Sequence, residues 1–96
     1  MSKNPSDNRP SKAVALKYEG GKRAPTVVAK GDGLLAEKII ELAQQHDVPL
    51  YEDADLLLLL ANVELDDTIP EELFKAVAEV LAFVYSLKKK MPVIKV

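Results

Sequence analysis

The amino-terminal segment holds the residues of this chain with the most distinctive chemistry. Asn4 precedes Pro5, and a second asparagine, Asn8, follows four residues later. An asparagine side-chain amide can attack its own backbone carbonyl carbon and break the next peptide bond. A following proline favours this reaction because it has no N–H to support the competing deamidation. The sequence leaves three interpretations open: a self-cutting turn, the remnant of one, and a flexible leader.

The acidic residues and the lone histidine form no recognisable catalytic motif. Glu52, Asp53 and Asp55 cluster where a strand is expected to meet a helix, and capping is the usual role of acids there. His46 follows an expected helix end, where a plain capping role is typical. The absence of cysteine and the single histidine exclude disulfides and multi-histidine metal sites. We therefore expect no conventional enzyme, no metal and no cofactor.

Composition indicates one small soluble domain. The chain has 96 residues, of which 48% are hydrophobic and 29% charged, which is ordinary for a globular protein. Its longest apolar run, residues 56–61, is far shorter than the roughly 20 residues of a membrane-spanning helix. The polar start is unlike a signal peptide. We expect a cytoplasmic protein without direct membrane insertion.

Basic side chains concentrate in the first third of the chain, although the net charge is only −2. Such asymmetry is typical of a partner-binding surface, and a solvated strand edge explains it equally well. Nucleic-acid binding requires more positive charge and nearby exposed aromatic rings, so no stable nucleic-acid complex is expected. The candidate partner-binding residues are Lys12, Lys17, Lys22, Arg23 and Lys30.

The first half of the chain predicts a hairpin and then a helix. Alternating apolar residues predict a strand over 13–18, paired glycines at 20–21 predict a turn, and a β-rich run predicts a second strand over 26–30. Helical spacing begins at Leu34 and ends near His46, with Asp32 as the expected N-cap. The expected buried stripe is Leu35, Ile39 and Leu42, with Ala36, Ile40 and Ala43 beside it.

A third strand and a leucine-rich helix follow. Residues 48–51 resemble a short strand, and Pro49 favours an edge or strand-start position because it has no N–H to donate. The leucine run at 55–61 covers every side of a helix, so we expect a largely buried helix capped by Asp53 or Asp55.

The last helix has a clear start signal in the sequence. Thr68 and Glu71 are spaced as a capping box, with a proline between them. The expected apolar stripe is Leu73, Val77, Val80, Val84 and Leu87. The β-prone tail 91–96 has no evident place in this scheme. These patterns divide the chain into a polar leader (1–11), an α/β domain (12–90) and an apolar tail (91–96).

Four stretches together resemble a known family. They are AVALKY (13–18), APTVVAKG (24–31), KIIELAQQHDVPLYED (38–53) and VELDDTIPEELFKAVAEVLAFVYSLKK (63–89). They resemble the cytoplasmic domain of the FlhB/YscU/SpaS/EscU family, membrane components of flagellar and virulence type III export gates. The resemblance implies an α/β fold, a small mixed sheet of three to four strands surrounded by about four helices, which follows a transmembrane domain in full-length members.

The resemblance also implies a self-cleaving Asn-Pro-Thr-His turn just before the first strand, whose cleavage permits a switch in the class of exported substrate. The corresponding positions here are Asn8, Arg9, Pro10 and Ser11. Arg9 removes the scissile Asn-Pro bond, and Ser11 removes the histidine that would assist proton transfer. Asn4-Pro5 lies out of register. We therefore predict no autocleavage.

We also expect the chain to differ from full-length members in having no membrane domain and no strand before the cleavage turn. If the family sheet includes such a strand, this sheet has a vacant edge. Three outcomes remain open for that edge. It is protected by Lys12, Lys17 and Lys22, filled by the chain's own 93–96 tail, or completed by a strand of a full-length partner.

The expected function is therefore that of a non-catalytic binding module of a protein export apparatus. It substitutes for, or modulates, the cleaved C-terminal domain of the gate protein. Its expected partners are the gate membrane protein, other export components or secreted substrates, and it is expected to be a monomer recruited peripherally to the inner membrane. The alternative is a family-derived interaction domain unrelated to secretion, with RNA binding through the basic first third as one form.

Overall fold

The computed structural model describes residues 11–18, 24–85 and 92–96. Its elements are β1 (Lys12–Lys17), β2 (Thr26–Asp32), α1 (Leu34–Gln45), β3 (Leu50–Glu52), α2 (Ala54–Leu60), the 3-10 turn η2 (Glu71–Leu73), α3 (Phe74–Tyr85) and β4 (Val93–Lys95). The leader 1–10 and the predicted glycine turn lie outside the described residues. No helix in the described part of the chain is long and apolar enough to cross a membrane.

The strands form one mixed sheet in the order β2-β1-β4-β3. Strand β1 is antiparallel to both β2 and β4, whereas β3 and β4 are parallel. The predicted hairpin is therefore confirmed, and so is the α/β class with a small mixed sheet. Strand β3 is an edge strand that begins one residue after Pro49, as the missing N–H of that proline predicts.

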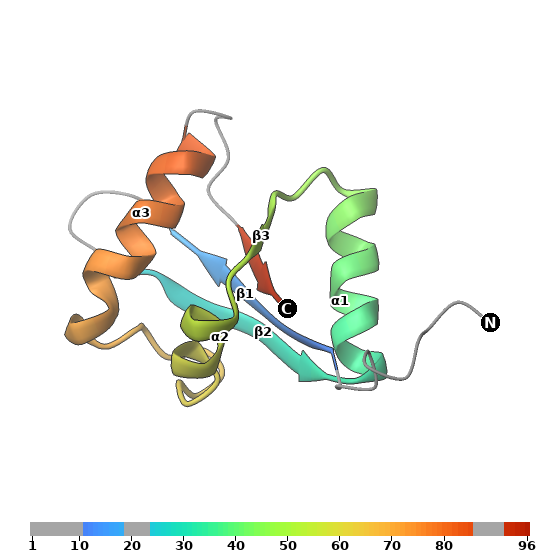
Figure 1. The fold of residues 1–96 in the computed structure, drawn as a ribbon, viewed down its shortest axis with the longest axis horizontal. Coiled ribbons are helices and arrows are strands. Elements are labelled where there is room, and N and C mark those ends of the chain that lie inside the picture. The colour runs from blue at the N-terminus through green and yellow to red at the C-terminus, as the bar shows by residue number, and fades with distance from the viewer. Residues whose placement is uncertain (1–10, 19–23, 86–91) are drawn as a thin grey trace.

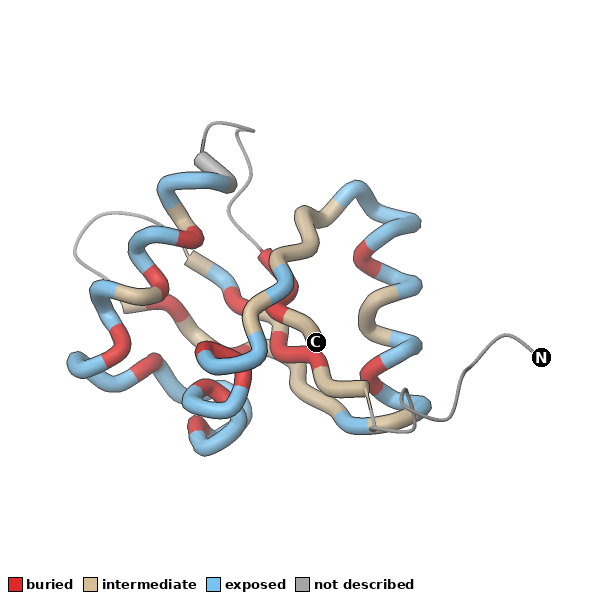
Figure 2. Tube along the Cα trace, viewed as in Figure 1, coloured by how far each residue is buried: buried red, intermediate tan, exposed pale blue. Residues whose placement is uncertain are grey.

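Both faces of the sheet are covered by helices (Figure 1). Along β1, Val14 and Leu16 belong to the main core with residues of α2 and α3. Their neighbours Ala13 and Ala15 belong to a second, smaller core with α1. The alternation of side chains along a strand sends successive residues to opposite faces. Figure 2 shows how the buried positions gather along the sheet and the inner sides of the helices.

Helix α1 packs through its alanines, which corrects the predicted leucine stripe. Ala36 and Ala43 are buried, whereas Leu35 is 56% exposed and Leu42 is 42% exposed. Small side chains leave room for close approach to the sheet, where Ala13 and Val93 complete the small core. A Cβ added at Gly31 would come within 2.5 Å of Leu35 Cγ, so Leu35 lies directly over the β2 backbone.

Asp32 is not the N-cap of α1, contrary to the prediction. Gly33 occupies that position with φ 59°, a conformation that glycine adopts without strain, and no side chain caps the helix. Asp32 is the last residue of β2 and pairs with Lys12 across the hairpin. The pairing of β2 with β1 therefore extends further than the glycine-rich sequence suggests.

Helix α2 begins as predicted at Asp53, whose Oδ1 accepts a hydrogen bond from the Leu56 backbone N–H at 3.0 Å. The leucine run is only partly buried. Leu56, Leu57 and Leu60 are buried, whereas Leu58 and Leu59 are at least half exposed. The helix lies on one face of the sheet, so the leucines on its outer side have no core to enter.

The start of the last helix also differs from the prediction. Pro70 precedes the η2 turn, and no side chain caps it. Thr68 instead forms a bridge with Thr26, and the Ile69 N–H donates to the Pro25 carbonyl oxygen at 2.9 Å. Residues 66–69 cover the outer edge of β2 near its start, which takes Thr68 away from a capping role. The predicted burial of Leu73, Val77 and Val80 is confirmed; of the predicted stripe's other members, the Val84 side chain and Leu87 lie outside the described part.

The apolar tail enters the middle of the sheet. Strand β4 lies between β1 and β3, and Pro92, Val93 and Ile94 are buried. Of the three outcomes open for the sheet, the structure shows the one in which the chain's own tail supplies a strand. That strand is central rather than at an edge.

Candidate functional site

The start of β1 is where the resemblance places the cleavage turn. Asn8, Arg9 and Pro10 lie outside the described residues, and Ser11 is the one described position of the four. Its carbonyl oxygen accepts a hydrogen bond from the Gly33 N–H at 2.8 Å. This bond ties the entry of β1 to the turn between β2 and α1.

Lys12 forms an ion pair across the hairpin. Its Nζ lies 2.9 Å from Asp32 Oδ1, and the two residues are opposite each other in the register of β1 and β2. The Asp32 side chain is 72% exposed, so the pair contributes little to stability. Its effect is to bring a cation and an anion together at this end of the hairpin.

Lys30 is turned toward α2. Its Nζ donates to the Val63 carbonyl oxygen at 2.8 Å and to the Ala61 carbonyl oxygen at 3.2 Å. Carbonyl groups after the end of a helix have no intrahelical donor, and a cation there also complements the helix dipole. Lys30 therefore joins β2 to the end of α2. Sequence reasoning grouped it with the surface cations because nothing local distinguishes it from them.

The structure brings only part of the predicted basic set together. Lys12 and Lys30 are near neighbours across the hairpin, whereas Lys17 is exposed at the opposite end of β1. Lys22 and Arg23 lie outside the described residues. A partner-binding role for the basic set stays a prediction.

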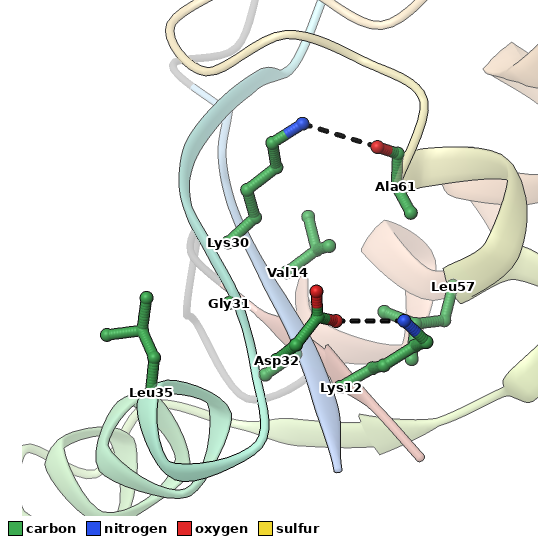
Figure 3. A pocket seen from close by; sticks show the side chains of 9 residues that line it. Lys12, Val14, Lys30, Gly31, Asp32, Leu35, Leu57 and Ala61 are labelled. Carbon is green, nitrogen blue, oxygen red and sulfur yellow. Dashed lines mark hydrogen bonds and ion pairs between the residues drawn. The ribbon is translucent and has the colours of Figure 1, made fainter. Parts of the chain in front are cut away.

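A cavity of about 330 Å³ opens beside Lys12 and Lys30, at the C-terminal end of β2. Figure 3 shows both lysines among its lining, with Leu35 and Leu57 contributing apolar surface. Asp32, the one acid among the described lining residues, already pairs with Lys12. The charged groups of this cavity thus have partners within the chain, and none is placed as a nucleophile beside a base.

The other acidic and basic candidates have structural contacts. His46 is the C-cap residue of α1, and its backbone N–H donates to the Leu42 carbonyl oxygen at 3.1 Å. Glu52 lies 3.8 Å from Lys95, and Asp53 caps α2. The capping interpretation of His46 and Asp53 is confirmed. Within the described ranges, no three histidine, aspartate or glutamate residues gather as a metal site would require.

The slot that holds β4 is the second candidate site. On one side, Leu16 N–H donates to the Pro92 carbonyl oxygen at 3.0 Å. On the other, Val93 N–H donates to the Pro49 carbonyl oxygen at 2.9 Å, and Asp53 N–H donates to the Lys95 carbonyl oxygen at 3.1 Å. Sequence reasoning offered the tail as one of three ways to fill a vacant edge, but it did not place the tail in the middle of the sheet. Its run of apolar residues was the available signal.

Comparison with known proteins identifies the family of this chain. Residues 7–84 match the model of the FlhB HrpN YscU SpaS family. The chain is 48% identical over 81 residues to the flagellar biosynthetic protein FlhB of Bacillus subtilis, a match that covers 82% of this chain and 22% of that protein. It is 43% identical over 81 residues to the uncharacterized protein YlqH of the same organism, with 83% of this chain and 87% of that protein covered.

The fold agrees with these sequence matches. The crystal structure of the cytoplasmic domain of FlhB from Shewanella putrefaciens superposes with a TM-score of 0.74 at 40% identity, covering 80% of this chain and 64% of that one. The fold class is therefore that of an export-gate cytoplasmic domain. The chain belongs to the FlhB HrpN YscU SpaS family. It spans about a fifth of the length of the FlhB relative and most of the length of YlqH.

Proposed function

We propose that this chain is a non-cleaving binding module of a protein export apparatus. It acts in the cytoplasm, is recruited to the inner-membrane gate by its partners, and replaces or modulates the C-terminal domain of the gate protein. The observation that carries the proposal is the match of residues 7–84 to the family model, together with the fold shared with the cytoplasmic domain of FlhB.

The contacts of Lys12 and Lys30 are structural and do not place either lysine for catalysis. Lys30 and Lys12 bind groups of their own chain, and the cavity beside them contains no nucleophile next to a base. Arg9 and Ser11 stand where the resemblance requires the proline and histidine of the self-cleaving turn. A small relative, YlqH, is matched over 87% of its own length, so a protein of this family consists mainly of the segment matched here.

The partner is proposed to be the gate protein or components that dock on it. FlhB is named as a flagellar biosynthetic protein, so a flagellar export apparatus is the first system to test. The contribution of the described residues is an α/β surface with the fold of the cytoplasmic domain of FlhB.

Complementation in trans tests this function. Bacillus subtilis cells whose FlhB lacks the segment matching this chain are expected to lose motility, and co-expression of this chain is expected to restore part of it. The same cells allow co-purification of the chain with the truncated FlhB. A matched control carries Leu57→Asp, which places a charge in the core and removes the fold.

Restored motility together with co-purification supports the proposal. The cytoplasmic domain of FlhB itself, expressed in the same cells, is the positive control. If the chain reaches the protein level of this control and yet gives neither motility nor co-purification, the proposal is contradicted. Cells with intact FlhB separate the two modes of action: overexpression of a competing module lowers motility, whereas a module that only substitutes leaves it unchanged.

A further inference from the structure

Strand β4 is unusual because it is central in the sheet but lies outside the family match. The match ends at residue 84, whereas β4 spans Val93–Lys95. Without β4, the β1–β2 hairpin and β3 have no strand pairing between them. The matched residues by themselves therefore leave a gap in the sheet, and β4 fills this gap in the present chain.

The hydrogen-bond ladder between β1 and β4 is incomplete. Leu16 donates its N–H to the Pro92 carbonyl oxygen at 3.0 Å. Residues facing each other in this way normally exchange two hydrogen bonds, but Pro92 has no N–H to donate in return. Only Ala13, Val14 and Ala15 of the longer strand β1 are paired with residues of β4. A strand with another residue opposite Leu16 would form one more ladder bond than β4 does.

The side chains of β4 define what fits the gap. Val93 is buried in the small core with α1, and Ile94 is fully buried in the main core. Two successive residues must therefore be apolar, one for each face of the sheet, and β-branched residues suit an extended strand. The next residue, Lys95, lies near Glu52 at the rim of the sheet.

We propose that the gap between β1 and β3 is a strand-exchange site. An extended segment of a partner protein replaces β4 there, antiparallel to β1 and parallel to β3. This segment carries two successive β-branched apolar residues and a residue other than proline opposite Leu16. The proposal rests on the proposed function only in that the chain acts by binding another protein.

In this arrangement β4 is an internal competitor. It is tethered to the sheet, so its effective concentration is high, on the order of millimolar. A partner strand gains the site by forming more ladder bonds or by being held nearby. Weakening β4 must therefore strengthen the binding of an added strand, whereas an equal loss of packing elsewhere in the core must not.

Fluorescent peptides measure this competition on the purified full-length chain. One peptide carries residues 90–96, and a second carries the same residues with Pro92→Val. The chains compared are wild type, Ile94→Ala, and Ile69→Ala, which makes the same substitution in a buried residue on the far side of β2. The Pro92→Val peptide is expected to bind the Ile94→Ala chain about 10-fold or more tightly than wild type.

The order of binding distinguishes the site from general loosening of the core. The Ile69→Ala chain is expected to bind the Pro92→Val peptide with the affinity of wild type. The Ile94→Ala chain is expected to bind the unsubstituted peptide more weakly than the Pro92→Val peptide. If Ile94→Ala does not fold, Ile94→Val and Ile69→Val provide the same comparison. Equal binding to the two variant chains, or no binding to either Ile94 variant, would overturn the proposal.

A disulfide trap tests the register. The chain has no cysteine of its own. With Ala15→Cys in the chain and one cysteine at position 93 of the peptide, the only disulfide that can join chain and peptide links these two positions. Ala15 faces Val93, whereas Ala13 faces Lys95. Cross-linking of position 93 to Ala15→Cys but not to Ala13→Cys is expected; the reverse would contradict the proposed pairing.

Light scattering of the full chain at the same concentrations tests whether the strand of a second copy of the chain occupies the gap. A monomer is expected, and a dimer that dissociates when the Pro92→Val peptide is added would show that the strand comes from a second copy, which overturns the assignment to another protein. These measurements need only the purified chain and peptides. Their failure is therefore distinct from a failure of complementation in cells.

Discussion

The Lys30 ammonium donates a hydrogen bond to the Val63 carbonyl oxygen at 2.8 Å, and this bond joins the edge strand β2 to the chain that leaves α2. The Ala61 carbonyl oxygen accepts a second bond from the same nitrogen at 3.2 Å. A residue expected from the sequence to face a partner thus holds two elements of its own chain together.

Lys30→Met is expected to lower the free energy of unfolding by about 1–2 kcal/mol, because it removes two charge-assisted hydrogen bonds and leaves two carbonyl groups without this donor. Urea denaturation followed by circular dichroism measures the change. The control is Lys38→Met, which removes an exposed pair with Glu41 at 3.7 Å and is expected to cost less than about 0.5 kcal/mol. Equal losses in the two variants would contradict a structural role for Lys30.

Gly31→Ala is expected to destabilise the chain by about 1–3 kcal/mol, since the new Cβ would overlap Leu35. The same substitution in an open strand position would be neutral or stabilising. Leu35→Ala in the same chain is expected to restore most of the loss, because it removes the atoms that collide. A double-mutant cycle from urea denaturation measures this coupling. Additive losses would show that Leu35 does not cause the strain.

Ile94→Ala is expected to cost about 2–5 kcal/mol because it leaves a cavity in the main core. Thermal or urea unfolding measures this loss. Leu58→Ala is the control, since Leu58 is 57% exposed and its truncation is expected to change stability by less than about 1 kcal/mol. An Ile94→Ala chain as stable as the control would show that β4 is not part of the folded unit.

The chain is expected to keep its full mass on prolonged incubation, because Arg9 follows Asn8 and the scissile Asn-Pro bond is missing there. Intact mass spectrometry measures this directly. The positive control carries Arg9→Pro, Pro10→Thr and Ser11→His together, which rebuilds the family turn and is expected to release residues 1–8. Loss of residues 1–4 or 1–8 from the unaltered chain would contradict the prediction.

The fold was predictable wherever the signal is local. Alternation of apolar residues located β1, and a β-rich run located β2. The acid before the leucine run located the start of α2 at Asp53. The stripe of Leu73, Val77 and Val80 was predictable because helical spacing reports which side of a helix meets the core. Family membership followed from the same stretches, which cover most of the matched residues 7–84.

Prediction failed where two residue types competed for one position. In α1 both a leucine side and an alanine side have helical spacing, and the distance between helix and sheet decided for Ala36 and Ala43. Asp32 had the chemistry of an N-cap, but pairing with β1 kept it in the strand. Thr68 had a capping pattern and was instead used to cover the edge of β2.

The sequence by itself determined the family, the helices and the hairpin, because each depends on residues close together in the chain. The loss of cleavage chemistry at Arg9 and Ser11 stays a prediction from the same kind of local signal. Only the tertiary structure decided that Lys30 binds the end of α2 and that residues 93–95 lie between β1 and β3. Strand neighbours are set by the path of the whole chain, since any β-prone segment offers the same backbone donors and acceptors. The place of such a segment in the sheet is decided by the gap that the other elements leave.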